Sequence, residues 1–233
     1  MKETEFIEEL KKNNIFLSLE QIKQFEIYAN FLLDYNQKTN LTAIRTLDGV
    51  YLKHFYDSAS LLFYKMFTNE SMLDIGTGAG FPGIVLKIIC PNIKLTVIDS
   101  NNKKTTFIKL LLEKLHIKDV TIINDRVENL IEKNTFDIIT SRAVSSLRIL
   151  SELSLPYLKK GGNLIFMKSS VESEINESLD TINILGGDKP EVVNLKVSNE
   201  LGKRVLIIVK KVKETPNIYP RVYDKILKYP LKK

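Results

Sequence analysis

The sequence predicts an α/β fold in which a mostly parallel sheet follows an N-terminal helical extension, and three observations lead to this prediction. Apolar residues recur at helical spacing through the first 70 residues. Strand-like and helix-like stretches then alternate, which is typical of a parallel sheet covered on both faces. A glycine-rich turn joins the first strand to the helix that follows it. We expect a helical extension (1–70), a sheet domain (71–212) and a basic C-terminal tail (213–233).

Hydrophobic spacing and turn residues place the elements in order. The first three helices are predicted at 2–13, 19–36 and 47–66. The predicted strands are 71–75, 94–99, 119–124, 136–140, 162–167, 191–197 and 204–210. The helices among them are predicted at 82–90, 102–116, 126–133, 146–159 and 171–185. Only a short turn separates the last two strands, so we expect them to pair antiparallel, and the tail shows no clear period.

The composition excludes several classes of protein. No apolar run approaches the roughly 20 residues that span a bilayer, and the N-terminus lacks the apolar core of a signal peptide, so we expect a cytoplasmic protein. A single cysteine, Cys90, rules out an internal disulfide, and with only two histidines besides it we expect no thiolate–imidazole zinc site. The net charge of +6 leans towards an anionic partner, or else reflects only solvated helix faces.

The glycine-rich turn favours one nucleoside cofactor. Gly76, Gly78 and Gly80 follow an apolar strand that ends in Asp74-Ile75. A dinucleotide fingerprint needs a small residue five positions after its first glycine, and here that position is Phe81. The spacing therefore favours S-adenosylmethionine, which has no phosphate, over a nicotinamide cofactor or a purely structural turn.

Three further strand ends carry candidate site residues. Asp99 follows the second strand, where a carboxylate accepts hydrogen bonds from ribose hydroxyls; its alternative role is a helix N-cap. Val127 and Glu128 follow the third strand and suit an adenine, or are simply the start of a helix. Arg142 follows the fourth strand, where a guanidinium needs an anion, a solvent cleft or a surface salt bridge.

The chain lacks two devices that methyl transfer often requires. No Asn/Asp-Pro-Pro-aromatic turn, which is typical of amino-group methylation, follows the fourth strand. Methylation at carbon 5 of a pyrimidine needs a nucleophilic cysteine, but Cys90 lies far from the predicted ligand edge. Guanine N7 needs neither device, because its free lone pair can attack a sulfonium methyl held about 3–3.5 Å away. We therefore expect no general base. His54 is the one tempting candidate, and we expect it to make a structural hydrogen bond to an aspartate instead.

Short segments spread from about residue 25 to the C-terminus resemble one protein family. Among them, Gly-Phe-Pro-Gly at 80–83 together with Ser-Arg-Ala-Val at 141–144 is a specific combination. The other matching segments are 40–44, 53–58, 73–79, 99–100, 103–104, 126–128, 160–162, 168, 203–204, 219–221 and 230–231. Together they resemble the bacterial small-subunit rRNA guanine-N7 methyltransferases, also called glucose-inhibited division protein B.

The resemblance implies both a fold and an activity. The fold would be that of a class I S-adenosylmethionine-dependent methyltransferase: a Rossmann-like seven-stranded sheet, mostly parallel, with an antiparallel last strand. The substrate would be a guanine of the 16S rRNA 530 loop, nucleotide 527 in the usual rRNA numbering, in free rRNA, an assembly intermediate or the small subunit. We expect a monomer that uses no metal and no membrane.

The resemblance also assigns residues. The expected cofactor contacts are Gly76, Gly78, Phe81, Asp99, Val127, Glu128 and Arg142. The expected RNA contacts are Arg126, Lys168, Arg204 and Arg221. No catalytic acid or base is implied, although Arg142 could also act at the reacting atoms.

Other functions remain open at this stage. A methyltransferase for a small molecule would not need the basic tail, and its substrate affinity would be nearly insensitive to salt. A non-catalytic ribosome-assembly protein that binds RNA would not need the intact glycine turn. Phe81 disfavours a nicotinamide oxidoreductase.

Overall fold

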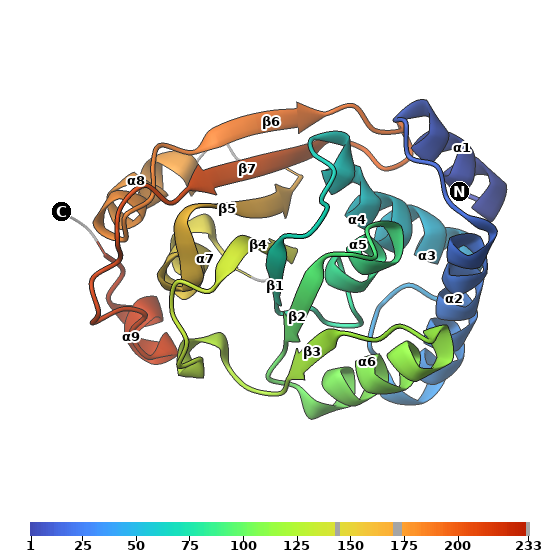
Figure 1. Ribbon diagram of the computed structural model, residues 1–233, viewed down its shortest axis with the longest axis horizontal. Helices are drawn as coiled ribbons and strands as arrows, with labels where there is room; N and C mark the ends of the chain where they lie inside the picture. Colours follow the sequence, from blue (N-terminus) through green and yellow to red (C-terminus); the bar gives the residue numbers. More distant parts are fainter. Residues whose placement is uncertain (143–144, 170–173, 232–233) are drawn as a thin grey trace.

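Seven strands form one sheet, in the order β3-β2-β1-β4-β5-β7-β6 (Figure 1). The computed structural model describes residues 1–142, 145–169 and 174–231. The strands are β1 (Ser71–Ile75), β2 (Lys94–Ile98), β3 (Val120–Ile123), β4 (Phe136–Arg142), β5 (Leu158–Lys168), β6 (Glu191–Leu195) and β7 (Arg204–Lys210). The first five pair in parallel, whereas β7 runs antiparallel to both β5 and β6. The predicted fold class, with its antiparallel last strand, is therefore confirmed.

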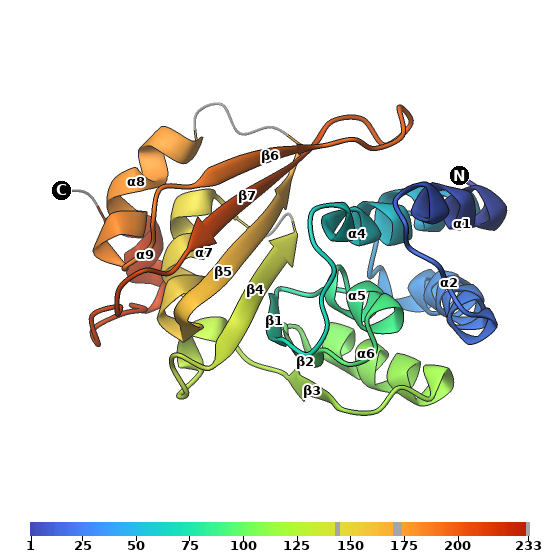
Figure 2. The ribbon, with the colours of Figure 1, turned by 45° about the horizontal axis from the view of Figure 1, so that its top comes forward.

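Helices cover both faces of the sheet (Figure 2). One face carries α5 (Gly83–Ile89), α6 (Asn102–Leu115) and the N-terminal helices, whereas the other carries α7 (Leu147–Ser154), α8 (Glu174–Ile184) and α9 (Tyr223–Lys228). Each face has its own cluster of buried apolar side chains. The apolar runs of the central strands follow from this arrangement, since both of their faces are buried.

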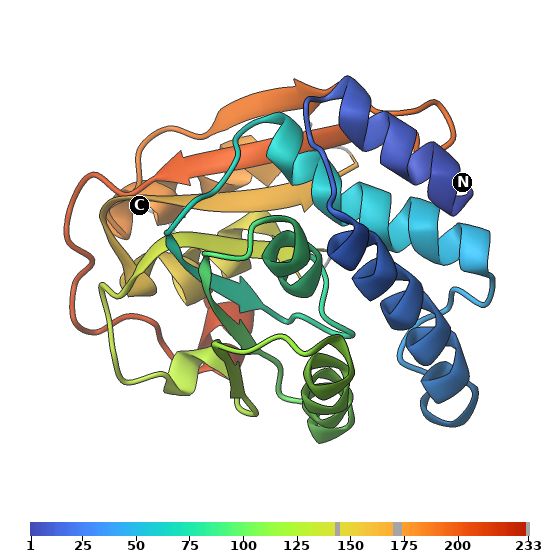
Figure 3. The same cartoon turned by 45° about the vertical axis from the view of Figure 1, so that its right-hand side comes forward.

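The N-terminal helices pack on the α5–α6 side (Figure 3). They begin with α1 (Glu3–Lys12) and α2 (Leu19–Thr39), which bury Phe6, Phe25 and Tyr28 at helical spacing. Both helices were predicted, although α2 continues three residues beyond its predicted end. Ser18 caps α2, since its hydroxyl accepts a hydrogen bond from the backbone of Gln21.

The third predicted helix, 47–66, is helical only to residue 63 and changes its winding on the way. It passes from α3 (Leu47–Val50) into a π-helical segment (Tyr51–Tyr56), then α4 (Asp57–Ala59) and a 3₁₀ turn (Ser60–Phe63). Wider π turns occur frequently at functional sites. Here the π segment contains His54, and Asp57 follows it directly.

Three predicted segments differ in the structure. The helix predicted at 126–133 is a single 3₁₀ turn (Val127–Asn129), and Ile131 beyond it is 91% exposed. The helix predicted at 146–159 ends earlier, because β5 already begins at residue 158. The tail contains α9 and buries Ile226. Residues 171–173 of the last predicted helix lie outside the described residues.

Within the described residues, no helix is both long enough and apolar enough to cross a membrane.

Candidate cofactor and acceptor site

A cavity of about 570 Å³ opens at the carboxyl ends of β1, β2, β3 and β4. Ligands bind at this edge in open α/β sheets. The cavity is lined by Ile75, Gly76, Ile98, Asp99, Ser100, Lys104, Asp125, Arg126, Val127, Glu128, Arg142, Leu153 and Tyr223. Five of the seven predicted cofactor residues therefore meet here, from four separate strand ends.

The glycine turn lies at the β1 end of this cavity. Gly76, Gly78 and Gly80 all have positive φ angles, of 67°, 62° and 101°, which side chains rarely adopt. A Cβ on Gly80 would lie 2.6 Å from the Tyr28 hydroxyl, so this glycine is required by packing. A Cβ on Gly78 would meet no protein atom nearer than the Gly76 carbonyl at 4.0 Å. The open space above Gly78 fits a ligand that lies along the turn.

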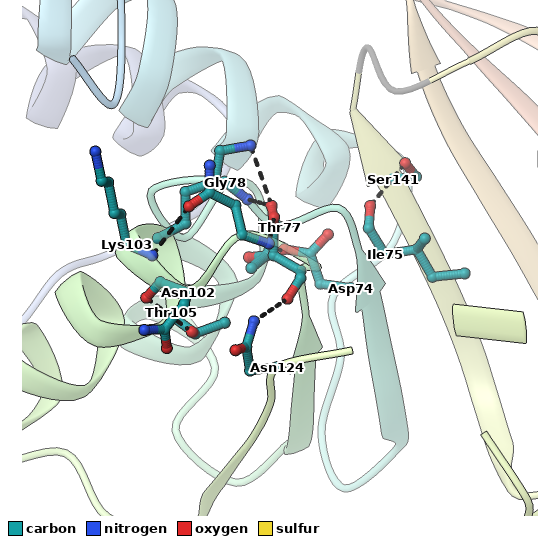
Figure 4. Close-up of polar contacts among 12 residues, drawn as sticks. Asp74, Ile75, Thr77, Gly78, Asn102, Lys103, Thr105, Asn124 and Ser141 are labelled. Atoms are coloured by element: carbon teal, nitrogen blue, oxygen red, sulfur yellow. Dashed lines mark hydrogen bonds and ion pairs between the residues drawn. The ribbon is translucent and has the colours of Figure 1, made fainter. Parts of the chain in front are cut away.

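Asp74 holds the turn from below. Its Oδ2 accepts hydrogen bonds from the Thr77 hydroxyl (2.6 Å) and the Gly83 amide (2.9 Å), and Figure 4 shows Thr77 and Gly78 beside Asp74. Complete burial raises the pKa of Asp74 to about 6, although both hydrogen bonds oppose this shift. Asp74 thus connects the Thr77 side chain in the turn to the first residue of α5, and its Oδ1 has no hydrogen-bond partner among the described residues.

Asp99 connects the second strand to the glycine turn. Its Oδ2 accepts from the Gly78 amide (3.0 Å) and lies 3.3 Å from Lys104 Nζ, and its Oδ1 accepts from the Asn101 amide (2.9 Å). The Asn124 side chain donates to the carbonyl of Asp99 (3.0 Å; Asn124 is labelled in Figure 4). Asn101, and not Asp99, is the N-cap of α6, so the alternative N-cap role was wrong. A carboxylate can accept about four hydrogen bonds, so Asp99 retains capacity for a ribose hydroxyl.

Residues after β3, in α7 and in α9 line another part of the cavity. Val127 is 6% exposed, and its carbonyl accepts a hydrogen bond from the Tyr157 hydroxyl (2.7 Å). Leu153 of α7 and Tyr223 of α9 complete this part. The guanidinium of Arg126 lies 5.3 Å from the centre of the Tyr223 ring. An apolar slot with carboxylate and backbone groups at its edge suits an adenine.

Arg142, the last residue of β4, is held by the π-helical segment. Its Nη1 donates to the Lys53 carbonyl (2.9 Å) and to Asp57 Oδ2 (3.1 Å). Its Nη2 lies 3.0 Å from His54 Nδ1. Arginine can only donate, so His54 Nδ1 accepts and its Nε2–H donates to the Thr42 hydroxyl (2.8 Å).

The predicted His54–aspartate hydrogen bond was therefore wrong. Both ring nitrogens of His54 have other partners, whereas Asp57 bonds Arg142 and, at 2.6 Å, Arg204 Nε. Burial is the main reason that the pKa of His54 falls to about 3, and the charge of Arg142 lowers it further. His54 is therefore neutral at physiological pH, and its one lone pair is used.

Phe81 supports this cluster from behind and does not line the cavity. Its ring stacks between Tyr28 (centroids 5.4 Å apart) and His54 (4.4 Å apart). The Arg142 guanidinium lies 5.1 Å from the Phe81 ring centre. The predicted contact of Phe81 with the cofactor stays a prediction, as do the other residue assignments.

The four predicted RNA contacts differ in accessibility. Arg126 is the most open: 57% of its side chain is exposed, and it forms a 3.8 Å ion pair with Glu128 besides its contact with the Tyr223 ring. Lys168, Arg204 and Arg221 form close ion pairs with Glu174, Asp57 and Glu152, respectively. Residues 143 and 144 of the Ser-Arg-Ala-Val segment lie outside the described residues.

The sequence interpretation missed Lys104, Leu153 and Tyr223 as cavity residues and Asp57 as the residue that bridges two arginines. Only Lys104 had a readable signal, because it follows Asp99 by only five residues. As predicted, Cys90 is buried, at the far end of α5 from the turn. Within the described ranges, no group of three or more His, Cys, Asp or Glu side chains could hold a metal ion.

The strand order, the glycine turn and the nucleoside-sized cavity define a class I methyltransferase that uses S-adenosylmethionine. Solved structures agree on the fold. An S-adenosylmethionine-dependent methyltransferase from Aquifex aeolicus aligns with a TM-score of 0.52 at 19% identity, covering 70% of this chain and 93% of that one. TYW2 from M. jannaschii, solved with S-adenosylmethionine, aligns with a TM-score of 0.50 at 17% identity, covering 62% and 70%.

The chain belongs to the rRNA small subunit methyltransferase G (GidB) family, whose pattern it matches over residues 21–204. It is 43% identical over 219 residues to Ribosomal RNA small subunit methyltransferase G of Staphylococcus aureus strain JH9, and the match covers 92% of each chain. The protein of that name from strain Newman is 42% identical over the same length. The family resemblance predicted from the sequence motifs is thereby confirmed.

Proposed function

We propose that this protein transfers the methyl group of S-adenosylmethionine to N7 of a guanine in 16S rRNA, at nucleotide 527 of the 530 loop. Relatives that share 43% of its residues are named for the small-subunit ribosomal RNA, which supports this class of substrate. The net charge of +6 is consistent with a polyanionic partner.

The observation that carries the N7 assignment is the contact between Arg142 Nη2 and His54 Nδ1 at 3.0 Å. It removes the one histidine near the cavity as a proton acceptor, because the lone pair of Nδ1 faces a permanent donor. His116, the other histidine, ends α6 at the opposite edge of the sheet. A target with an unprotonated lone pair needs no base, and guanine N7 is such a target in RNA.

The chain's own residues then work by positioning. S-adenosylmethionine supplies an electrophilic methyl group on a sulfonium. We assign the glycine turn to its methionine part, Asp99 to the ribose, and Val127 with Glu128 to the adenine. Arg142 lies where the cavity meets the N-terminal helices, and we assign it to orienting the acceptor base.

Two of the expected RNA contacts retain donors for a phosphate. Arg126 is largely solvent-accessible. Arg204 uses Nε for Asp57 and Nη1 for the Lys203 carbonyl, which leaves Nη2 without a partner in the described part of the chain. Lys168 donates to Glu174 and to the Ser145 carbonyl, so an RNA phosphate would have to share its ammonium group with these two partners.

The decisive experiment compares 16S rRNA from cells with and without the gene. Mass mapping of nuclease fragments should show one methyl group missing at a single guanine in the deletion strain. Reduction followed by aniline cleavage, which is selective for 7-methylguanine, should cut wild-type rRNA at that guanine only. The same aniline cleavage pattern and the same fragment masses in both strains would contradict the proposal.

A test with purified protein separates the alternatives. Incubation of the protein with tritiated S-adenosylmethionine and 16S rRNA, free or in small subunits, should give labelled RNA. The affinity of the protein for the rRNA should fall as the salt concentration rises. Cofactor binding with no transfer to any RNA would favour a non-catalytic assembly role. Transfer to small molecules alone, insensitive to salt, would favour the small-molecule alternative.

A further inference from the structure

The C-terminal segment after β7 is anchored to the sheet domain by a buried ion pair. Arg221 Nε and Nη2 each donate to Glu152 of α7, both at 2.7 Å, and the Arg221 backbone amide donates to the same carboxylate at 3.1 Å. Glu152 is 1% exposed. A paired fork of this kind fixes direction as well as distance. Arg221 is thus directed into the protein, where it holds its own segment in place.

Other contacts fix the rest of this segment. Lys133 Nζ donates to the carbonyls of Asn217 (2.8 Å) and Tyr219 (2.5 Å). The Thr181 hydroxyl donates to the Leu231 carbonyl (3.0 Å), and Ile226 of α9 is 2% exposed in the apolar cluster beneath α7. Figure 1 shows α9 beside α7.

This anchoring brings an aromatic ring to the cavity. Tyr223 comes two residues after Arg221 and lines the cavity together with Val127, Glu128 and Leu153. The Arg126 guanidinium lies 5.3 Å from the ring centre, which is within the range of a cation–π contact. The two faces of this slot therefore come from distant parts of the chain: one from the loop after β3, in the middle of the sequence, and the other from α9, near the C-terminus.

We propose that Tyr223 forms the outer wall of the adenine subsite of S-adenosylmethionine, and that Arg221 is a positioning residue that acts through Glu152. An aromatic face stacks on any purine, and the phenol hydroxyl is not needed for that contact. On this proposal the tail serves the cofactor, and Arg221 is not a contact for RNA.

Calorimetry with S-adenosylmethionine and the full-length protein tests the role of Tyr223. Tyr223→Ala should weaken binding by about tenfold to a hundredfold, whereas Tyr223→Phe should bind almost as the wild type does. The affinity of Tyr223→Ala for S-adenosylhomocysteine should fall by the same factor, because the adenine is common to both ligands. Lys225→Ala, an exposed change on the same helix, is the control and should leave both affinities unchanged.

Arg221→Ala distinguishes the positioning role from RNA binding. The positioning role predicts weaker cofactor binding and an unchanged salt dependence of 16S rRNA binding. A phosphate contact predicts the reverse, with the slope of log affinity against log salt shallower by about one unit. Should Arg221→Ala fail to fold, Tyr223→Ala still decides, because it removes no buried ion pair.

Two results would overturn the proposal: unchanged affinity of Tyr223→Ala for both ligands, or an Arg221→Ala protein in which only the salt slope changes. Cofactor affinity is measured without RNA, so these outcomes are independent of which base is methylated.

Discussion

Replacing Arg142 with alanine should separate catalysis from folding. The change removes hydrogen bonds to the Lys53 carbonyl, Asp57 and His54, at 2.9, 3.1 and 3.0 Å. The Asp57 side chain is 10% exposed, and a carboxylate left alone at such a site would cost about 3–5 kcal/mol. It is not left alone, because Arg204 Nε still donates to it at 2.6 Å.

We therefore expect a moderate loss of stability. Hydrogen bonds to a charged group contribute roughly 1.5–3 kcal/mol. In a chain of this size each kcal/mol lowers the melting temperature by about 2–4 °C, so Arg142→Ala should melt a few degrees lower and remain folded during the assay. Turnover should fall much further, by about a hundredfold, because an acceptor base displaced by about 1 Å loses the in-line geometry.

Single-turnover transfer from labelled S-adenosylmethionine to 16S rRNA measures this effect directly. Arg142→Lys is the matched control: its ammonium can satisfy Asp57, but it cannot also reach His54 and the Lys53 carbonyl as the planar fork does. We expect the lysine variant to regain stability without regaining turnover. The reasoning fails if Arg142→Ala unfolds while its remaining folded fraction turns over at the wild-type rate, because Arg142 would then be only a structural ion-pair residue.

Three further predictions address the cofactor site. Gly78→Val should weaken cofactor binding in calorimetry, because a Cβ at this position would enter ligand space, with the Gly76 carbonyl at 4.0 Å as its nearest protein atom, and because a φ of 62° strains a valine backbone; normal binding would refute the role of the turn. Asp99→Ala should weaken binding by about tenfold to a hundredfold, because the ribose and the Gly78 amide both lose a charged acceptor, and unchanged affinity would remove the ribose assignment. The pKa of Asp74 is raised from 3.8 to about 6 in the folded protein, so between these pH values the folded state holds a proton that the unfolded state has released. The contribution of this group to stability is therefore fully present below about pH 4 and is lost as the pH rises through 6. Denaturant titrations at several pH values measure the free energy of unfolding of Asp74→Asn and of the wild type. The difference in favour of Asp74→Asn should grow by up to about 3 kcal/mol between about pH 4 and pH 7, and a pH-independent difference would contradict this.

Local patterns were sufficient where a segment buries its own apolar residues. The strands at 71–75 and 204–210 have their predicted limits, and the turn at 76–80 has the positive φ angles that its glycines suggested. The segment 126–133 was predicted wrongly as a helix: Val127 and Leu130 pack against the core, but Ile131, at helical spacing from Val127, does not. Ile131 stays exposed, and only one turn forms.

The sequence by itself determined the fold class, the ligand-binding edge of the sheet and five of the thirteen residues that line the cavity, because glycine spacing and strand periodicity act over a few residues. The tertiary structure alone decided which partners the charged groups took. His54 bonds Arg142, 88 positions away, and not an aspartate close in sequence. Arg221 pairs with Glu152, 69 positions away, and so brings Tyr223 to the cofactor cavity. An ion pair is set by which side chains the packed elements bring within about 4 Å, and no short-range pattern encodes that distance.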